Sequence, residues 1–456
     1  MFKSKEIEQL YNKRMGRYMA AIKGLPVDRV PITFNTCYFL ERNSGYNFQE
    51  LLYEPDKWMQ SEVQFAQEYP EVDTFRGNIT YAPTVDVVDY KLYKIPGREI
   101  EPHSLQQFVE DEYMTVDEYD QFINDPIGYR MNTYFPKILG EYVKGDVRSH
   151  VAFLKSGFLQ GILGGINRQR AEKLKFEYGY GQTAQGSLTA PFDKLSDNYR
   201  GLRGIMRDMF KNADKVNEAC EAIMHNMLSM CAATADKNKV LPIFIATHKP
   251  CFMSPKQFDK FYWPTFYEGC MTMIKAGYTF RIFLEGDWGP HWDHLQDFPK
   301  GSTIFDVDNE ADIFDAKKKF GSKNFITGGL PTDLLILGTP DEVTEKVKYL
   351  IDNLAAGGGW GPQGGGHMPE DCKPENMRAL CEAIEKYGRY DGQLTPEFQT
   401  AYNQDLKIEG VSPVPVITPW ETFKDEHEWK ILGDEKVLKE NWERLERQAF
   451  SWIYNR

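Results

Sequence analysis

Short apolar runs alternate with amphipathic helical stretches through the second half of this chain, and this alternation limits the possible folds more than any other feature. Strand candidates lie at 240–246, 279–284, 302–305 and 325–328, and a helical stretch follows each of them. Parallel strands need a long crossover between them, so the pattern predicts a parallel α/β fold. Four such units favour the C-terminal half of a (β/α)8 TIM barrel over a doubly wound open sheet.

The N-terminal half is less regular. Strand candidates at 29–34 and 72–75 flank a helix predicted over 47–69, whereas 80–145 is rich in acidic and aromatic residues and holds several prolines. We therefore expect one barrel domain over residues 1–390, with an insertion at about 80–145 in its N-terminal half.

Residues 391–456 depart from the strand–helix rhythm. Three prolines at 413, 415 and 419 stiffen this stretch, and 434–454 has the pattern of an amphipathic helix. The segment is too short to bury a core of its own. We expect a C-terminal helical extension that packs on the barrel or on a partner chain, as in a homodimer.

Charge and cysteine usage narrow the class of protein. The net charge of −13 argues against a nucleic-acid partner, because binding to phosphates needs a basic face. No apolar run approaches the roughly 20 residues that cross a bilayer, and the N-terminus lacks the apolar core of a signal peptide. Seven scattered cysteines without a CxxC pair indicate a reducing compartment. A cytoplasmic location without membrane association is therefore expected.

Four segments, in the same order along the chain, resemble the uroporphyrinogen decarboxylase superfamily. They read GLPVDRVP at 24–31, MSPKQF at 253–258 with FYWP at 261–264, LLILGTPDEV at 334–343 and KPENMRA at 373–379. Two further segments, 189–208 and 283–286, are similar to the larger methyltransferases that demethylate methoxylated compounds in anaerobes. The resemblance implies a TIM barrel and transfer of a methyl group to a separate corrinoid protein.

The sequence differs from uroporphyrinogen decarboxylase itself at the substrate positions. That enzyme follows its first strand with two arginines that bind carboxylates, whereas Thr36 and Leu40 stand at the matching places here. It also has an aspartate after its second strand, where this chain reads Arg76-Gly77-Asn78. A substrate with many carboxylates needs charge-assisted donors. These differences argue against decarboxylation of a tetrapyrrole.

The resemblance also implies a metal site. Smaller members that methylate thiols carry His-Xaa-Cys at a strand end and a cysteine in a late glycine-rich loop, and Glu285 and His367 stand at or next to the cysteine positions here. Zinc accepts nitrogen and oxygen ligands and keeps one position open in catalytic sites. We expect Zn²⁺ to be bound by Glu285, His367 and His248, with Asp306 as a further ligand or a proton donor.

The change of ligand type predicts the reaction. With fewer thiolate ligands, zinc is a harder Lewis acid that suits oxygen. The predicted function is a zinc-dependent methyltransferase that moves a methyl group from a methoxylated, aromatic substrate to the cob(I)alamin of a corrinoid protein, with Asp306 or His248 beside the departing oxygen. The residues predicted to line the substrate pocket are Asn35, Tyr38, Phe39 and Trp288.

Three alternatives stay open at the level of sequence. The same fold could methylate a thiol, which the missing cysteines disfavour, or decarboxylate a small acid, which would release carbon dioxide without a corrinoid. The chain could also be a non-catalytic corrinoid-binding subunit, which would lack a substrate pocket. The sequence does not identify the methyl donor.

Overall fold

The protein is represented by a computed structural model that describes residues 1–36, 38–77, 80–391, 395–396, 398, 408–427 and 430–455. Cys37 and Asn78, which entered the sequence analysis, lie outside these residues. The six cysteines that the structure does describe are all free thiols, as expected.

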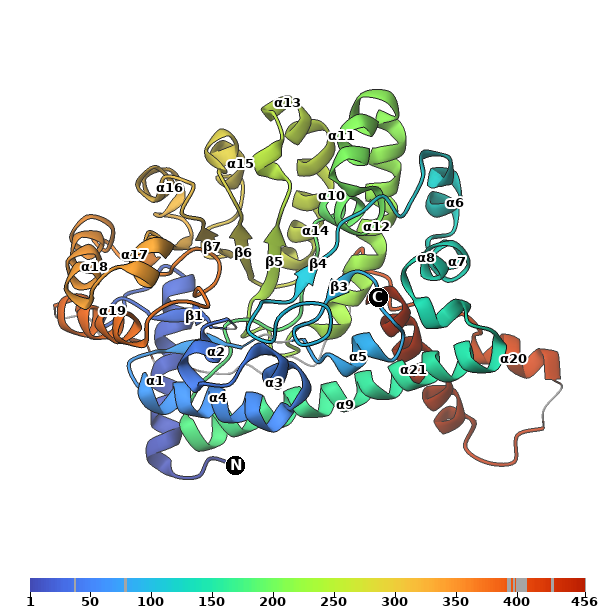
Figure 1. The fold of residues 1–456 in the computed structure, drawn as a ribbon, viewed down its shortest axis with the longest axis horizontal. Coiled ribbons are helices and arrows are strands. Elements are labelled where there is room, and N and C mark those ends of the chain that lie inside the picture. The colour runs from blue at the N-terminus through green and yellow to red at the C-terminus, as the bar shows by residue number, and fades with distance from the viewer. Residues whose placement is uncertain are drawn as a thin grey trace.

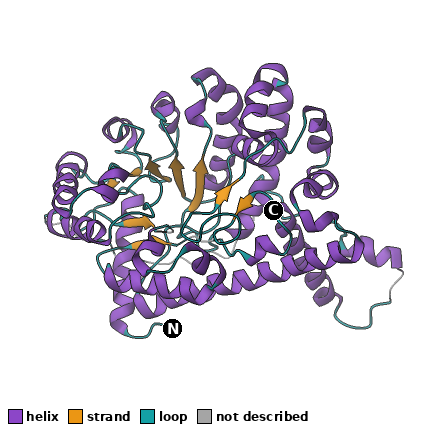
Figure 2. Ribbon diagram, in the orientation of Figure 1, coloured by secondary structure: helices purple, strands orange, loops and turns teal. Residues whose placement is uncertain are grey.

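Parallel strands form the centre of the molecule, and helices surround them (Figures 1 and 2). The strands of the barrel are β1 (Thr33–Asn35), β2 (Thr74–Arg76), β5 (Ile243–Thr247), β6 (Phe280–Leu284), β7 (Thr303–Val307), β8 (Phe325–Thr327) and β9 (Trp360–Gly361). β1 pairs with β2, and β5 to β9 pair in sequence order. Residues 180–188 join the two sheets, because Gly181 forms a parallel bridge to Thr74 and Ser187 forms one to Phe244. The seven strands and the segment 180–188 thus occupy the eight positions of a (β/α)8 barrel.

Helices precede the barrel and follow its strands. They are α1 (Lys5–Ile22), α2 (Phe39–Ser44), α3 (Phe48–Tyr53), α4 (Pro55–Glu68), α10 (Pro191–Lys194), α11 (Gly201–Lys211), α12 (Ala213–Thr234), α13 (Pro255–Gln257), α14 (Trp263–Lys275), α15 (Trp292–Leu295), α16 (Ile313–Phe320), α17 (Thr332–Leu337), α18 (Pro340–Leu354) and α19 (Pro374–Tyr387). Short 3-10 helices, η5 (Pro250–Phe252) and η7 (Gly289–His291), and the π-helical turns η4 (Leu195–Arg200) and η6 (Phe258–Tyr262) connect some of them.

Between β2 and residue 180 the chain builds a cover for one side of the barrel. Its short elements are α5 (Pro83–Asp86), β3 (Tyr93–Lys94), β4 (Gln107–Phe108), η1 (Val116–Glu118), α6 (Tyr119–Asn124), α7 (Pro126–Tyr129), η2 (Arg130–Tyr134), α8 (Phe135–Ile138) and η3 (Gly140–Val143). The long helix α9 (Asp146–Tyr178) then returns the chain to the barrel and lies along the lower edge of the molecule in Figure 1.

The described part of the C-terminal extension packs on this cover. It contains α20 (Trp420–His427) and α21 (Glu435–Asn455), and α21 crosses α9 (Figure 1). The ring of Trp452 meets the ring of Phe153 edge-on with centroids 4.0 Å apart. The guanidinium of Arg130 donates to the carbonyl oxygen of Ile453 from Nε at 3.3 Å and from Nη2 at 3.2 Å. The extension is therefore joined to the insertion and not only to the barrel.

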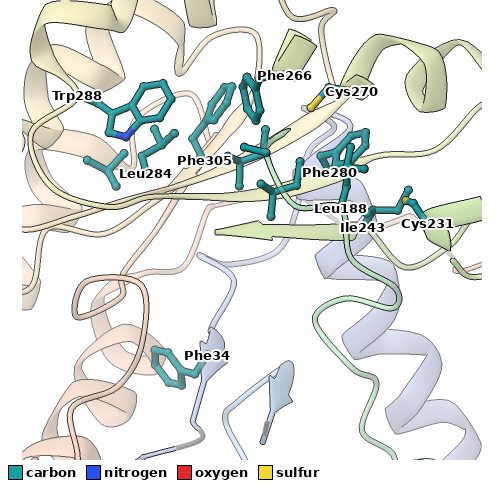
Figure 3. Packing of buried hydrophobic residues seen from close by; sticks show 14 of the residues in the cluster. Phe34, Leu188, Cys231, Ile243, Phe266, Cys270, Phe280, Leu284, Trp288 and Phe305 are labelled. Carbon is teal, nitrogen blue, oxygen red and sulfur yellow. The ribbon is translucent and has the colours of Figure 1, made fainter. Parts of the chain in front are cut away.

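Two layers of side chains hold the barrel together. Phe280 and Leu284 of β6 and Phe305 of β7 are buried with Phe266 and Cys270, between the strands and α14 (Figure 3). The interior layer is polar: Arg281 of β6 donates from Nε to Asp306 Oδ2 at 2.7 Å and from Nη2 to Gln363 Oε1 at 2.8 Å. The alternation of side chains along a strand places Arg281 inside the barrel and its two neighbours outside.

Several elements follow the sequence pattern closely. Thr339 caps α18 with a capping box to Glu342, and Pro340 begins the helix. The predicted helices are found with boundaries shifted by a few residues, although Glu54 separates the stretch predicted over 47–69 into α3 and α4. Helix α9 and the strand position at 180–188 were not predicted. None of the described helices is both long enough and apolar enough to span a membrane.

Candidate active site

His248 and Glu285 lie together where β5 and β6 end, as expected for strand-end residues of a barrel. His248 Nδ1 is 2.6 Å from Asp197 Oδ2, and Nε2 is 3.9 Å from Glu285 Oε2. Asp197 belongs to the π-helical turn η4, which follows the third strand position. The carboxylate of Asp197 thus orients the imidazole and directs its other nitrogen toward Glu285.

A buried carboxylate positions the backbone of His248. Asp193 accepts hydrogen bonds from the backbone N–H groups of His248 at 3.0 Å and Lys249 at 3.1 Å, and from the hydroxyl of Tyr262 at 2.8 Å. Burial raises the pKa of Asp193, and the charge of Asp197 adds to that effect. Because three donors converge on one side chain, the loop after β5 has little freedom, and the histidine is preorganised.

The charges around His248 favour its protonated form. Burial lowers its pKa, but the hydrogen bond from the ring to Asp197 and the charges of Asp193 and Glu285 raise it to about 9. Burial also raises the pKa of Glu285. At neutral pH the ring is therefore an imidazolium. Its Nδ1–H group donates a hydrogen bond to Asp197, and its Nε2–H group can donate to a neighbouring acceptor.

Lys249 links this cluster to the insertion. Its ammonium is 2.7 Å from Asp197 Oδ1 and 3.0 Å from Glu110 Oε2. Glu110 follows β4 of the insertion, 139 residues earlier in the chain. The two oxygens of Asp197 are thus shared between a histidine and a lysine, and the insertion contributes directly to the site.

The cluster opens into one large cavity of about 2320 Å³. His248, Lys249, Asp197 and Glu285 lie in its wall at the barrel end. The insertion, α9, the end of α12 and the C-terminal extension provide the rest, including Tyr90, Tyr93, Phe108, Phe153, Phe158, Lys237, Val411, Leu445 and Trp452. A cavity of this size exceeds the usual range for one small ligand, about 300–1,000 Å³.

His367 takes a different environment from His248. Its ring centroid is 5.2 Å from that of Tyr38 and 5.8 Å from that of Phe283. Burial lowers the pKa of His367 to about 4, and the positive charges of Arg76 and Arg281 act in the same direction. The ring is therefore neutral at pH 7 and packed among aromatic side chains.

The donors expected to bind zinc do not form a three-ligand site as they stand. Among the described residues, no group of three His, Cys, Asp or Glu side chains is arranged to hold a metal ion. His248 approaches Glu285 but is already held by Asp197, while His367 faces aromatic rings. The predicted ligand set of Glu285, His367 and His248 therefore does not fit this geometry, and we derive no catalytic step from a metal. Zinc binding stays a prediction for metal analysis of the purified protein.

Asp306 lies inside the barrel and not at the site. Its side chain is fully buried, with Oδ2 accepting from Arg281 Nε at 2.7 Å and Oδ1 accepting from the Thr327 hydroxyl at 2.5 Å. Both oxygens are thus occupied by neighbours in the interior layer. The expectation that Asp306 is a proton donor or ligand is corrected: the carboxylate neutralises a buried arginine.

The predicted pocket walls are also corrected in part. Phe39 packs against Phe65 and Tyr69, and Trp288 packs against Phe258, and both are fully buried in the core. Asn35 is buried, and its side-chain amide donates to the carbonyl oxygen of Gly366 at 3.0 Å, which fixes the loop before His367. Tyr38 is partly buried beside His367. None of the four lies in the wall of the large cavity.

Sequence reasoning missed the residues that orient His248. Asp193 and Asp197 stand four apart in the segment 189–208, and Lys249 directly follows the histidine. A pair of acidic residues at this spacing just after a strand position could have drawn attention to that segment. No local pattern marks Glu110 as their neighbour.

Eight parallel strand positions surrounded by helices define a (β/α)8-barrel protein, and its candidate site lies at the carboxyl ends of β5 and β6, the usual end of the barrel. The family model of uroporphyrinogen decarboxylase (URO-D) matches residues 166–387. This part of the chain is therefore similar to the uroporphyrinogen decarboxylase family.

A solved structure described as a methyltransferase from Methanosarcina mazei shares the fold. It superposes with a TM-score of 0.55 at 16% sequence identity, and the match covers 81% of this chain and 98% of that one. At 16% sequence identity, this similarity is evidence for a shared fold alone. No curated protein matches the sequence.

Proposed function

We propose that this protein is a methyltransferase that removes the methyl group from a methoxylated substrate and passes it to the corrinoid of a separate protein. The observation that carries the proposal is the position of His248, which Asp197 orients so that Nε2 faces the cavity beside Glu285. The shared fold with a methyltransferase from Methanosarcina mazei supports it.

In this reaction the bond between the methyl carbon and the ether oxygen breaks, and both electrons of that bond stay on the oxygen. The reduced corrinoid of the partner supplies the nucleophile that receives the methyl group. His248 gives its Nε2 proton to the departing oxygen, so that an alcohol or phenol leaves instead of an anion. Asp197 keeps the ring in the required orientation and stabilises its protonated form before the transfer.

The size and wall of the cavity agree with two reactants meeting there. A small methoxylated molecule fills only part of about 2320 Å³, which leaves room for a second, larger group at the same opening. Glu285 stands beside the proton donor, and its negative charge favours the protonated form of the His248 ring.

A cob(I)alamin methylation assay across methoxyarenes, amines and thiols tests the proposal, with metal analysis of the same preparation. We expect methyl transfer from methoxylated compounds, and His248→Gln should lower kcat by about 100-fold or more, because it removes the proton donor. His225→Gln, on the exposed face of α12, is the matched control and should leave kcat unchanged.

Two results would contradict this function. One is the absence of methyl transfer from every compound in the panel. The other is release of carbon dioxide from a small acid without any corrinoid, which would make the chain a decarboxylase.

A further inference from the structure

The side chain of Lys194 lies in the wall of the large cavity and has no ion-pair partner among the residues that the structure describes. It ends α10, directly before the turn that holds Asp197, and its half-buried side chain lines the cavity together with Asp197 and His248. Lys249, in the same wall, is paired with Asp197 and Glu110. The side chain of Lys194 makes no such ion pair or hydrogen bond to any described residue, whereas its backbone N–H donates to the carbonyl oxygen of Ala190 at 3.0 Å.

The surroundings of Lys194 do not neutralise its charge. The nearby carboxylate of Asp197 is already shared by His248 and Lys249. Arg130 adds a second positive charge at this end of the cavity. Burial and that charge lower the pKa of Lys194 to about 7, although Asp197 opposes them. Withdrawing an ammonium from water without a counter-ion is costly, so an anion bound beside Lys194 would stabilise the protonated form of its side chain.

We propose that Lys194 forms an anion-binding subsite of the cavity and that the ligand it selects is an aromatic carboxylate. Phe108, Tyr90 and Tyr93 of the insertion line the same cavity and offer flat, apolar surface to an aryl ring. The carboxylate would pair with the ammonium of Lys194. This inference rests on the proposed function for one point only: the methoxy group of such a substrate would lie toward His248.

Equilibrium binding without any corrinoid tests the subsite separately from catalysis. Calorimetry compares 4-methoxybenzoate with the neutral 4-methoxybenzamide, with inorganic phosphate as a third ligand. The wild-type protein should bind the carboxylate about 10-fold more tightly than the amide, because a hydrogen bond to a charged group contributes more than one between neutral groups. Phosphate should bind no more tightly than the amide.

Two lysine variants identify the residue responsible. Lys194→Gln should weaken binding of the carboxylate by about 10-fold or more and leave the amide unchanged, whereas Lys194→Arg should retain the preference. Lys237→Gln is the matched control: it removes an exposed lysine from the wall of the same cavity and should change neither affinity. Circular dichroism should confirm that each variant is folded.

The outcomes separate this inference from the proposed function. Carboxylate binding that depends on Lys194, without methyl transfer in the cob(I)alamin assay, would support the subsite and contradict the methyltransferase. Methyl transfer with equal affinity for acid and amide would overturn the subsite alone. Tight phosphate binding that Lys194→Gln abolishes would overturn the carboxylate as the ligand class.

Discussion

At the scale of single residues, the behaviour of His248 depends on one carboxylate. Asp197 Oδ2 accepts a hydrogen bond from His248 Nδ1 at 2.6 Å, and the same carboxylate forms an ion pair with Lys249. Glu285 and Asp193 add negative charge from two other elements, and together they outweigh the effect of burial on the pKa of His248. The histidine is therefore a weak acid at neutral pH and not the neutral ring that its ordinary pKa would give.

Asp197→Asn should change the pH profile of the reaction in a defined direction. A general acid works in its protonated form, so kcat/KM is present below the pKa of His248 and is lost as the pH rises through it. The variant removes the main group that raises this pKa, so the descending limb should move from near pH 9 toward the ordinary value of 6.5. Rates measured between pH 5 and 10 check it.

The control for this profile is Asp287→Asn. Asp287 is exposed, and its side chain accepts the backbone N–H of Gly289, which an asparagine can also do. The descending limb of the pH profile of Asp287→Asn should coincide with that of the wild-type protein. A limb that stays near pH 9 in Asp197→Asn would show that another group is the proton donor.

At the scale of elements, the contact between α9 and α21 explains how the extension is held. Phe153 and Trp452 form an edge-on pair, and Trp452 is 9% exposed. Val147, Leu154 and Phe158 of α9 stay exposed, the last two in the wall of the cavity, so the extension covers only part of that helix. The extension therefore protects one stretch of α9 and one wall of the cavity at the same time.

Trp452→Ala should loosen the extension and lower the free energy of unfolding by about 3 kcal/mol, because a buried aromatic side chain is lost from a packed contact. Amide hydrogen exchange should increase first along α21, while the barrel strands stay protected. Leu432→Ala, at a side chain that is 88% exposed, should change the free energy by less than about 0.5 kcal/mol. Unchanged exchange in α21 would contradict this contact.

At the scale of the whole molecule, a polar interior layer connects strands on different sides of the barrel. Arg281 of β6 pairs with Asp306 of β7 and reaches Thr33 of β1 at 3.3 Å and Gln363 beyond β9 at 2.8 Å. All four side chains are buried. This network helps to close the barrel and keeps the carboxyl ends of the strands, and so the site, in register.

Asp306→Asn should destabilise the fold more than it affects chemistry. The change leaves the Arg281 guanidinium buried without a counter-ion, which costs about 3–5 kcal/mol. Urea unfolding followed by tryptophan fluorescence measures it, with Asp315→Asn at a partly exposed position of α16 as the control. A variant of normal stability that has lost methyl transfer would restore Asp306 to the catalytic role that the sequence suggested.

The sequence alone predicted the barrel and many of its elements. The alternation of apolar and amphipathic segments, the capping box at Thr339 and the proline at the start of α18 act over a few residues, so they can be read directly from the chain. Helix α9 was missed because glycines at 157, 161, 164 and 165 and a weak apolar periodicity hide it. His248 and Glu285 were predicted to lie together because strand ends meet at one end of a barrel.

Only the tertiary structure decided what surrounds these two residues. Asp197 is 51 residues from His248 and Glu110 is 139 residues from Lys249, so neither pairing leaves a local pattern. Folding likewise placed Asp306, Phe39 and Trp288 in the interior and separated His367 from a ligand set. Local sequence preferences determine the helices and strands. Which side chains are buried, and which partners they bind, depends on the distant segments that the closed barrel brings into contact.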